Sequence, residues 1–379
     1  MAVGGGSGGH VTPVLAVINQ LHHLDANLEV RFICDKAFES QARGLMQHAA
    51  VPVHVSTIMA GKFRRYSHLT FWQHFTVPQV VLKNSSDIVK VAIGFMQSIW
   101  LLLRHRPDVV FAKGGYVCLP FGVAARLLRV PLVIHDSDTR PGLTNRVLAR
   151  FATQIATGSP LENYPYDPHK SQYIGVPIGE DFTPVQASQQ KLFKEALGVD
   201  PTKKLVVATG GGLGSWSINM ALVKAARALS SKGIAVYSVT GKGHYEEVAP
   251  LVTGIDDYVV VPFVYEKMNE VLGAADVVIS RASATFLQEL AGLGKAVIAV
   301  PARHLGDQLK NAEVYKQAGA AVVMTDHEIS IGDALEQMIV ELMSSEKKRR
   351  ELGAKLHEFA RPNAARDLAQ LIVDAAKQA

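Results

Sequence analysis

Short apolar runs alternate along the chain with longer stretches in which apolar residues recur every three or four positions. The short runs predict buried strands, and the longer stretches predict amphipathic helices. In the first half, strands are predicted at 1–3, 30–34, 51–55, 109–112, 132–135 and 154–157. The pattern then restarts, with strands predicted at 205–209, 235–240, 258–263, 277–280 and 296–300. Strands that alternate with helices predict an α/β fold whose parallel sheets carry helices on both faces.

The restart of the pattern predicts two similar domains. Each half opens on a glycine-rich turn, at 4–10 and at 210–214, and the segment 173–184 has the proline and glycine content of a linker. We therefore predict an N-terminal domain over residues 1–174 and a C-terminal domain over residues 175–362. Two such domains are expected to face each other across a cleft, where small ligands usually bind.

The stretch 277–293 provides the first candidate site. Ser283 follows a predicted strand and is typical of the residue that caps a helix, here over 284–293, whose free N–H groups attract a diphosphate. Gln288 and Glu289 lie opposite the apolar stripe of this helix, on a face expected to meet water or a ligand. From that face Glu289 is placed to reach a ribose. From the helix alone, an ordinary surface residue is the favoured alternative for Glu289, and the other motifs of the chain favour the ribose contact.

The composition indicates a globular protein with more than one core, since 48% of the 379 residues are hydrophobic. Two cysteines, Cys34 and Cys118, provide neither a disulfide framework nor a zinc site, which favours a reducing cytoplasm. The start of the chain lacks the pattern of a secretory signal. The longest apolar stretch, 91–103, is too short to cross a bilayer, so no membrane-spanning segment is expected.

Positive charge is concentrated in the first quarter of the chain, where no acidic residue occurs between Glu39 and Asp87. Within it, the segment 61–82 mixes cationic with aromatic side chains, which suits an anionic membrane surface. Core packing of the aromatic residues is an equally favoured alternative. Nucleic acid is disfavoured as a partner, because the segment matches no nucleic-acid-binding module. The candidate membrane residues are Lys62, Arg64, Arg65, Phe71 and Trp72.

Several motifs together resemble the MurG family, the N-acetylglucosaminyltransferases that complete lipid II for peptidoglycan. The motifs are GGSGGHVTP at 5–13, GGYVCLP at 114–120, HDSDTRPGLTNR at 135–146, GGGLGSWSIN at 210–219, SRASATFLQELAGLGKAVIAVP at 280–301 and DQLKNA at 307–312. Each is weak alone, whereas the set is specific and spans nearly the whole chain. The resemblance implies two facing Rossmann-like domains of the GT-B type, with a lipid-linked acceptor on the first and UDP-GlcNAc on the second. It also implies that the last helix, 363–379, returns to the first domain.

The resemblance further implies roles for single residues. His10 would be the general base that activates the 4-hydroxyl of the acceptor, and a neutral imidazole is available at pH 7. Arg281 is placed to assist the departing diphosphate. The UDP-GlcNAc site would comprise Ser7, Gly8, Gly9, Asp138, Gly212, Val264, Arg281, Ala284, Thr285, Phe286, Leu287, Gln288, Glu289 and Gln308. The acceptor would contact Gly114, Gly115, Tyr116 and Asn145. The expected location is peripheral, on the cytoplasmic face of the inner membrane.

Four positions depart from the family pattern: Asp138 replaces Asn, Gly179 replaces Arg, Gly212 replaces Ser, and Phe286 stands where Thr is frequent. Three alternatives therefore stay open, namely a transferase for another lipid such as diacylglycerol, a UDP-GlcNAc epimerase of the same fold, and a UDP-binding scaffold without activity. Asp136 and Asp138 are similar to a D-x-D metal motif. However, they follow a strand of the first domain, away from the expected UDP site, so no metal or cofactor is expected.

Overall fold

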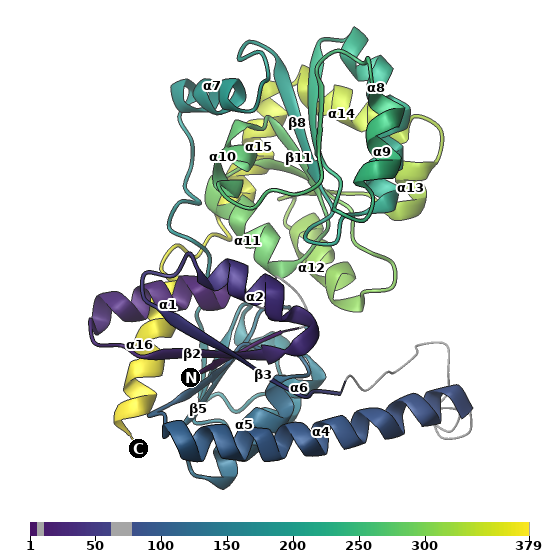
Figure 1. Cartoon of the computed structure of the whole chain (residues 1–379). Helices are drawn as coiled ribbons and strands as arrows, with labels where there is room; N and C mark the ends of the chain where they lie inside the picture. The colour runs from purple at the N-terminus through teal and green to yellow at the C-terminus, as the bar shows by residue number, and fades with distance from the viewer. Residues whose placement is uncertain (6–10, 62–77, 379) are drawn as a thin grey trace. The chain divides into compact units, whose positions relative to one another are not determined.

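The computed structural model describes residues 1–5, 11–61 and 78–378, with only the helical backbone for 78–84. The chain divides into two compact units (Figure 1). The first unit comprises Met1–Pro177 together with Asn363–Ala379, and the second comprises Ile178–Pro362. Each unit contains one parallel β-sheet with helices packed on it, which confirms the predicted fold class.

The sheet of the first unit has the strand order β3-β2-β1-β4-β5-β6-β7, and every neighbouring pair is parallel. Its strands are β1 (Ala2–Val3), β2 (Val30–Asp35), β3 (Val53–Ile58), β4 (Val110–Ala112), β5 (Leu132–Asp136), β6 (Gln154–Thr157) and β7 (Ser171–Tyr173). Its helices are α1 (Thr12–Leu24), η2 (Lys36–Phe38), α2 (Glu39–Met46), α4 (Pro78–His105), α5 (Cys118–Leu127), α6 (Leu143–Leu148), η3 (Leu161–Asn163) and α16 (Ala364–Lys377). The order of strands reverses at β1, and ligands of such sheets bind at the carboxyl ends of the strands beside that point.

The last helix, α16, packs against α1 although more than three hundred residues separate them. Leu368 and Ile372 of α16 share one buried cluster with Val14 and Ile18 of α1 and with Phe32 of the sheet. Burial of an apolar helix face is the main source of helix stability in a protein, so this contact fixes the C-terminal helix to the first unit.

The sheet of the second unit has the parallel order β10-β9-β8-β11-β12-β13 and thus repeats the plan of the first. Its strands are β8 (Lys204–Thr209), β9 (Ile234–Val239), β10 (Tyr258–Val261), β11 (Val277–Ser280), β12 (Ala296–Ala299) and β13 (Val322–Val323). Its helices are α7 (Ala187–Ala196), α8 (Trp216–Ser231), α9 (Tyr245–Val252), α10 (Met268–Ala274), α11 (Ala284–Leu293), α12 (Gly306–Gln317), α13 (Asp326–Ser330), α14 (Ala334–Ser344) and α15 (Glu346–His357). The point of reversal lies between β8 and β11, so the turns after these two strands form the expected ligand edge.

The helix α4 is longer than the apolar run in its sequence indicated. It spans 28 residues, and its part from Ser85 to His105 is long and apolar enough to cross a membrane by length and composition, with 28% of that window buried. The helix is therefore longer than the apolar stretch 91–103 indicated, and the absence of a membrane-spanning segment stays a prediction. In the structure α4 packs along α5 and touches β3.

Candidate functional site

Two glycine residues allow the turn after β8 to pack against its neighbours. A Cβ atom at Gly214, where φ is +78°, would lie 2.0 Å from the carbonyl oxygen of Thr240. A Cβ atom at Gly210 would lie 2.1 Å from the backbone nitrogen of Ser215. A side chain at either position would therefore displace backbone atoms. The space around Gly212 is open, so packing within the unit does not require glycine there.

Two helices begin at this edge of the sheet, and they differ in their N-caps. The Ser215 side chain accepts a hydrogen bond from the N–H of Ile218 and so caps α8. Ser283 has the extended backbone of an N-cap residue before α11, but its side chain accepts no such bond. The prediction of Ser283 at the N-cap is right in position and wrong in the hydrogen bond. The first N–H groups of α11 therefore lack a side-chain acceptor at the cap, and an anion can take that place.

The side chains expected on an open face of α11 are buried. Gln288 is 3% exposed and Glu289 is 7% exposed, and the Gln288 amide donates to the carbonyl oxygen of Phe359 at 3.0 Å. A Cβ atom at Gly292 would lie 2.4 Å from the carbonyl oxygen of Phe182. Segments from elsewhere in the same unit thus cover this face. Of the two expected alternatives, contact with water is wrong, and contact with a ligand stays a prediction.

Glu289 is a buried carboxyl group. Among the residues that the structure describes, none donates a hydrogen bond to it, and burial raises its pKa to about 8. Burial of a polar group that lacks a hydrogen bond is costly. Since Glu289 lies one and a half turns from the start of α11, a hydroxyl-bearing ligand held at that helix end would supply the missing donor.

Arg281 is already paired within the unit. Its guanidinium donates to Asp326 at 2.8 Å, to the carbonyl oxygen of Val300 at 3.0 Å and to the Ser217 hydroxyl at 3.0 Å. Burial acts to raise the pKa of Asp326, but hydrogen bonds from Ser217 and Arg281 hold that pKa below its usual value. The structure therefore gives Arg281 a structural partner, and any role at a departing diphosphate would have to be shared with this network.

The other predicted donor residues differ in their surroundings. Leu287 is fully buried in the core, so its side chain packs and does not face a ligand. Thr285 is 8% exposed. The side-chain oxygen of Gln308 accepts from the N–H of Ala302 at 3.0 Å, which holds it across the turn after β12. The partly exposed residues are Val264, Ala284 and Phe286.

In the first unit, the turn after β4 carries three of the predicted acceptor residues. Gly114 and Gly115 have φ values of +114° and +88°, which favour glycine. Tyr116 follows them half-buried, and burial together with the nearby carboxylate of Asp35 raises its pKa to about 12. Tyr116 is thus a neutral hydroxyl group at physiological pH.

The turn after β5 is organised by Asp136. Its carboxylate accepts hydrogen bonds from the Tyr166 hydroxyl at 2.8 Å and from the N–H of Gly142 at 3.2 Å. Burial raises the pKa of Asp136 to about 7, and the bond from Tyr166 opposes this. Asn145, 3% exposed, donates to the carbonyl oxygen of His135 at 3.0 Å. No group of three potential metal ligands occurs within the described ranges, so Asp136 and Asp138 have no third His, Cys, Asp or Glu beside them there.

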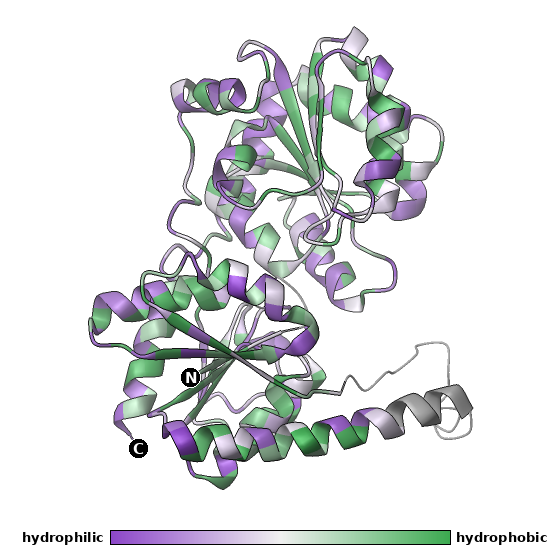
Figure 2. Cartoon of the chain, in the orientation of Figure 1, coloured by the Kyte–Doolittle hydropathy of each residue, from purple (hydrophilic) through white to green (hydrophobic). Residues whose placement is uncertain are grey.

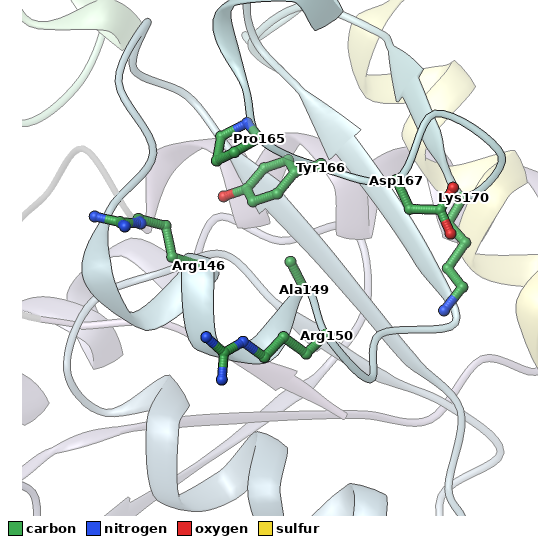
Figure 3. A pocket seen from close by; sticks show the side chains of 7 residues that line it. All are labelled: Arg146, Ala149, Arg150, Pro165, Tyr166, Asp167 and Lys170. Carbon is green, nitrogen blue, oxygen red and sulfur yellow. The ribbon is translucent and has the colours of Figure 1, made fainter.

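A cavity of about 310 Å³ beside α6 was not predicted from the sequence (Figure 3). It is lined by Arg146, Ala149, Arg150, Pro165, Tyr166, Asp167 and Lys170. Figure 3 shows the Tyr166 ring over Ala149, with the three cationic side chains around them. Arg146 lies in α6 and Arg150 in the turn that follows it, and the cluster of cationic residues there was the available sequence signal.

Nine predicted residues lie outside the described residues, so their expected roles stay predictions. They are Ser7, Gly8, Gly9, His10, Lys62, Arg64, Arg65, Phe71 and Trp72.

Comparison with known proteins assigns both halves of the chain. The model of the glycosyltransferase family 28 N-terminal domain matches residues 1–157, and that of the family 28 C-terminal domain matches residues 205–371. A protein of Halalkalibacterium halodurans named UDP-N-acetylglucosamine--N-acetylmuramyl-(pentapeptide) pyrophosphoryl-undecaprenol N-acetylglucosamine transferase is 30% identical over 380 residues. The match covers 99% of this chain and 98% of that protein.

Solved structures agree with the fold. The crystal structure of Acinetobacter baumannii MurG has a TM-score of 0.70 at 22% identity, with 99% of this chain and 98% of that chain covered. A putative UDP-N-acetylglucosamine 2-epimerase from Listeria monocytogenes has a TM-score of 0.69 at 12% identity, with 100% and 96% covered. The fold alone therefore does not separate a transferase from an epimerase, whereas the relatives in sequence do. On the two family models and the full-length relative, the chain belongs to the MurG family of glycosyltransferases.

Proposed function

We propose that the protein transfers N-acetylglucosamine from UDP-GlcNAc to the 4-hydroxyl of undecaprenyl-pyrophosphoryl-MurNAc-pentapeptide, which converts lipid I into lipid II. The observation that carries this proposal is the full-length likeness to the Halalkalibacterium halodurans transferase, whose name states both substrates. The geometry of each unit supports it, because both sheets bring polar groups and glycine turns to the edge where ligands of such sheets bind.

The donor is proposed to bind the second unit. The α11 N-terminus has no side-chain cap and suits a diphosphate, and the open space at Gly212 leaves room for it. Glu289 is buried and accepts no hydrogen bond from a described residue, which suits the ribose hydroxyls. The positive end of the α11 dipole stabilises the negative charge of the departing diphosphate in this proposal. Arg281 is paired with Asp326 and therefore contributes only a part of that stabilisation.

The acceptor is proposed to bind the first unit, at the turns after β4 and β5. Gly114, Gly115 and Tyr116 lie in the turn after β4. Asp138 lies in the turn after β5, and Asn145 lies in α6, which follows that turn. Asp138 was predicted as a donor contact. It lies in the first unit beside the acceptor turns, so we propose an acceptor role for it instead. His10 remains the proposed general base, a group that typically contributes about 10² to 10⁴ in rate.

A peripheral contact with an anionic membrane is the third part of the proposal. On α4, apolar residues recur at intervals of four and three positions and form one exposed stripe. They are Val89, Ile93, Met96, Trp100 and Leu103, each between 41% and 63% exposed. The Arg104 guanidinium lies 5.9 Å from the Trp100 ring, and Leu127 on neighbouring α5 is 62% exposed. Figure 2 shows the hydrophobic residues along α4. Because α4 packs along α5, we propose that this stripe lies on the membrane surface, at the cytoplasmic face of the inner membrane.

The enzymatic test uses purified protein and labelled UDP-GlcNAc, with lipid I, diacylglycerol or no acceptor. Lipid II formed only with lipid I supports the proposal. A glycosylated diacylglycerol would identify the other lipid transferase, and epimerised UDP-sugar without acceptor would identify the epimerase. UDP binding without turnover of any substrate would identify the protein as a UDP-binding scaffold without activity.

The membrane test uses vesicle co-sedimentation. Replacing Met96 and Trp100 by Ser should weaken binding to anionic vesicles even at high salt, since the inserted side chains contribute independently of charge. Changing Arg64 and Arg65 to Glu should abolish binding at low salt, because each cation near the surface contributes about 1 kcal/mol. The matched control is Leu192→Ser, a 61% exposed leucine on α7 of the second unit. If all variants sediment like the wild type, the membrane contact lies elsewhere.

A further inference from the structure

Lys113 is a buried lysine that none of the roles above employs. It follows β4 and is 1% exposed, which places it among the largest fully buried side chains of the described chain. Its backbone N–H donates to the carbonyl oxygen of Val3 on the neighbouring strand β1. Lysine is almost never fully buried in a protein unless its charge is paired, so its position requires a reason.

The ammonium group of Lys113 joins the two turns that carry the proposed acceptor contacts. Its Nζ donates to the Ser137 hydroxyl at 2.5 Å. Lys113 directly precedes Gly114, and Ser137 lies between Asp136 and Asp138 in the turn after β5. A single hydrogen bond thus connects the two turns across neighbouring strands.

The surroundings of Lys113 do not use its full bonding capacity. An ammonium group has three N–H donors, and within the described residues the bond to Ser137 is the one hydrogen bond from this group. Among the described residues, no carboxylate lies within ion-pair distance of the Lys113 ammonium group. The charges of Asp136 and Asp138 still act on that group from further away and raise its pKa. A Lys buried with unused donors costs folding free energy, and such costs are usual at functional sites.

We propose that Lys113 is a positioning residue for the acceptor: its ammonium group holds the turn after β4 against the turn after β5 in the arrangement that acceptor binding needs. This inference rests on the proposed function of the first unit. Lys113 itself does not touch the acceptor. It acts through Gly114 and Gly115 on one side and through Ser137 and Asp138 on the other.

The charge of Lys113 is responsive to pH. Burial lowers its pKa to about 8, and the carboxylates of Asp138 and Asp136 oppose this shift. The titratable groups that face it are these two carboxylates from the turn after β5 and the Cys118 thiol from α5, whose pKa burial raises to about 12. Between pH 7 and pH 9 the lysine loses its charge, and Asp136, whose burial raises its pKa to about 7, completes its ionisation, so both changes make the cluster more negative.

The test measures the acceptor KM, the turnover number and the midpoint of thermal unfolding for the wild type and Lys113→Met. Met has a similar length and no charge, so removal of a poorly satisfied buried ammonium should raise the unfolding midpoint. The same change should raise the acceptor KM about tenfold at pH 7, the effect of one lost charged hydrogen bond on a binding constant. Donor affinity should not change. In the wild type the acceptor KM should rise between pH 7 and pH 9, and in Lys113→Met it should rise less, because only the titration of Asp136 remains.

A matched control is Lys194→Met in the second unit. Lys194 is 5% exposed, but its Nζ donates to Asp276 at 2.8 Å and to the carbonyl oxygen of Lys203 at 2.7 Å. Breaking that pair should lower the unfolding midpoint and leave the acceptor KM unchanged.

Two results would overturn the inference: a wild-type acceptor KM that does not change between pH 7 and pH 9, or an active Lys113→Met variant with an unchanged KM. A fault in the proposed function would show itself differently, as a wild-type protein that transfers no sugar to lipid I.

Discussion

Glu289→Gln is expected to change how the stability of the second unit depends on pH. The side chain is 7% exposed, no described residue donates to it, and burial raises its pKa from 4.5 to about 8. A carboxyl group whose pKa is higher in the folded state binds its proton more tightly when folded. Its stabilising contribution is therefore complete below the unfolded pKa and is lost as the pH rises through the folded value.

The size of the effect follows from the difference in pKa. One pKa unit corresponds to 1.36 kcal/mol, so raising the pH from 5 to 8 should cost the wild type roughly 3 kcal/mol through this one group. Gln keeps the shape and cannot ionise, so Glu289→Gln should be more stable than the wild type at pH 8 and nearly equal to it at pH 5. Asp136 and Lys113 also titrate, but both are present in the two proteins and cancel in the difference.

The assay is chemical denaturation of both proteins at pH 5, 7 and 8, together with calorimetry of UDP binding. With calorimetry at pH 9, where most of the Glu289 carboxyl is ionised, Gln loses the charged acceptor for a ribose hydroxyl, so UDP affinity should fall by about 1.5 to 3 kcal/mol. Parallel stability curves over this pH range would refute the account of Glu289 as a buried carboxyl group that accepts no hydrogen bond from the described residues. Unchanged UDP affinity would separately show that Glu289 does not contact the ribose.

Three further predictions concern other positions. Gly214→Ala should lower stability by about 2 to 4 kcal/mol in chemical denaturation, because the new Cβ would lie 2.0 Å from the carbonyl oxygen of Thr240 at a residue with positive φ; a change below 0.5 kcal/mol would contradict this. Arg281→Gln should lower stability by roughly 2 kcal/mol through the loss of its bond to Asp326, and a larger loss of UDP affinity than of stability would instead assign Arg281 to the diphosphate. His10→Ala should reduce turnover by about 10² to 10⁴ with little change in UDP affinity, and near-normal turnover would exclude it as the base.

The secondary structure was largely predictable because it depends on local pattern. The bounds predicted for β11 and α11 agree with those observed, 277–280 and 284–293. The two unpredicted strands, β7 and β13, are short and lie at the edges of their sheets, where a strand needs few apolar residues. The apolar run in α4 underestimated its length, because a helix continues through polar residues that remain exposed or paired, as Lys90 does with Asp87.

The candidate site was predictable as a region and less so residue by residue. The turns after β4, β5 and β8 and the start of α11 lie at the carboxyl edges of their sheets, as the order of the predicted elements indicated, because parallel strands bring their carboxyl ends to one side. The sequence predicted the surroundings of single side chains less well. Arg281 was predicted to assist a departing diphosphate, and its guanidinium is bonded to Asp326, which lies 45 residues further along the chain.

The sequence by itself determined two α/β units and the order of strands and helices, because the periodicity of apolar residues records which side of each element packs. Only the tertiary structure decided whether the opposite side stays open. Glu289 lies on a face that periodicity assigns to water, and segments distant in the sequence, around Phe182 and Phe359, cover that helix. Lys113 lies in a glycine turn, where a lysine is normally exposed, yet neighbouring strands and the turn after β5 enclose it. Burial depends on all the segments that meet at a point, and local pattern records only one of them.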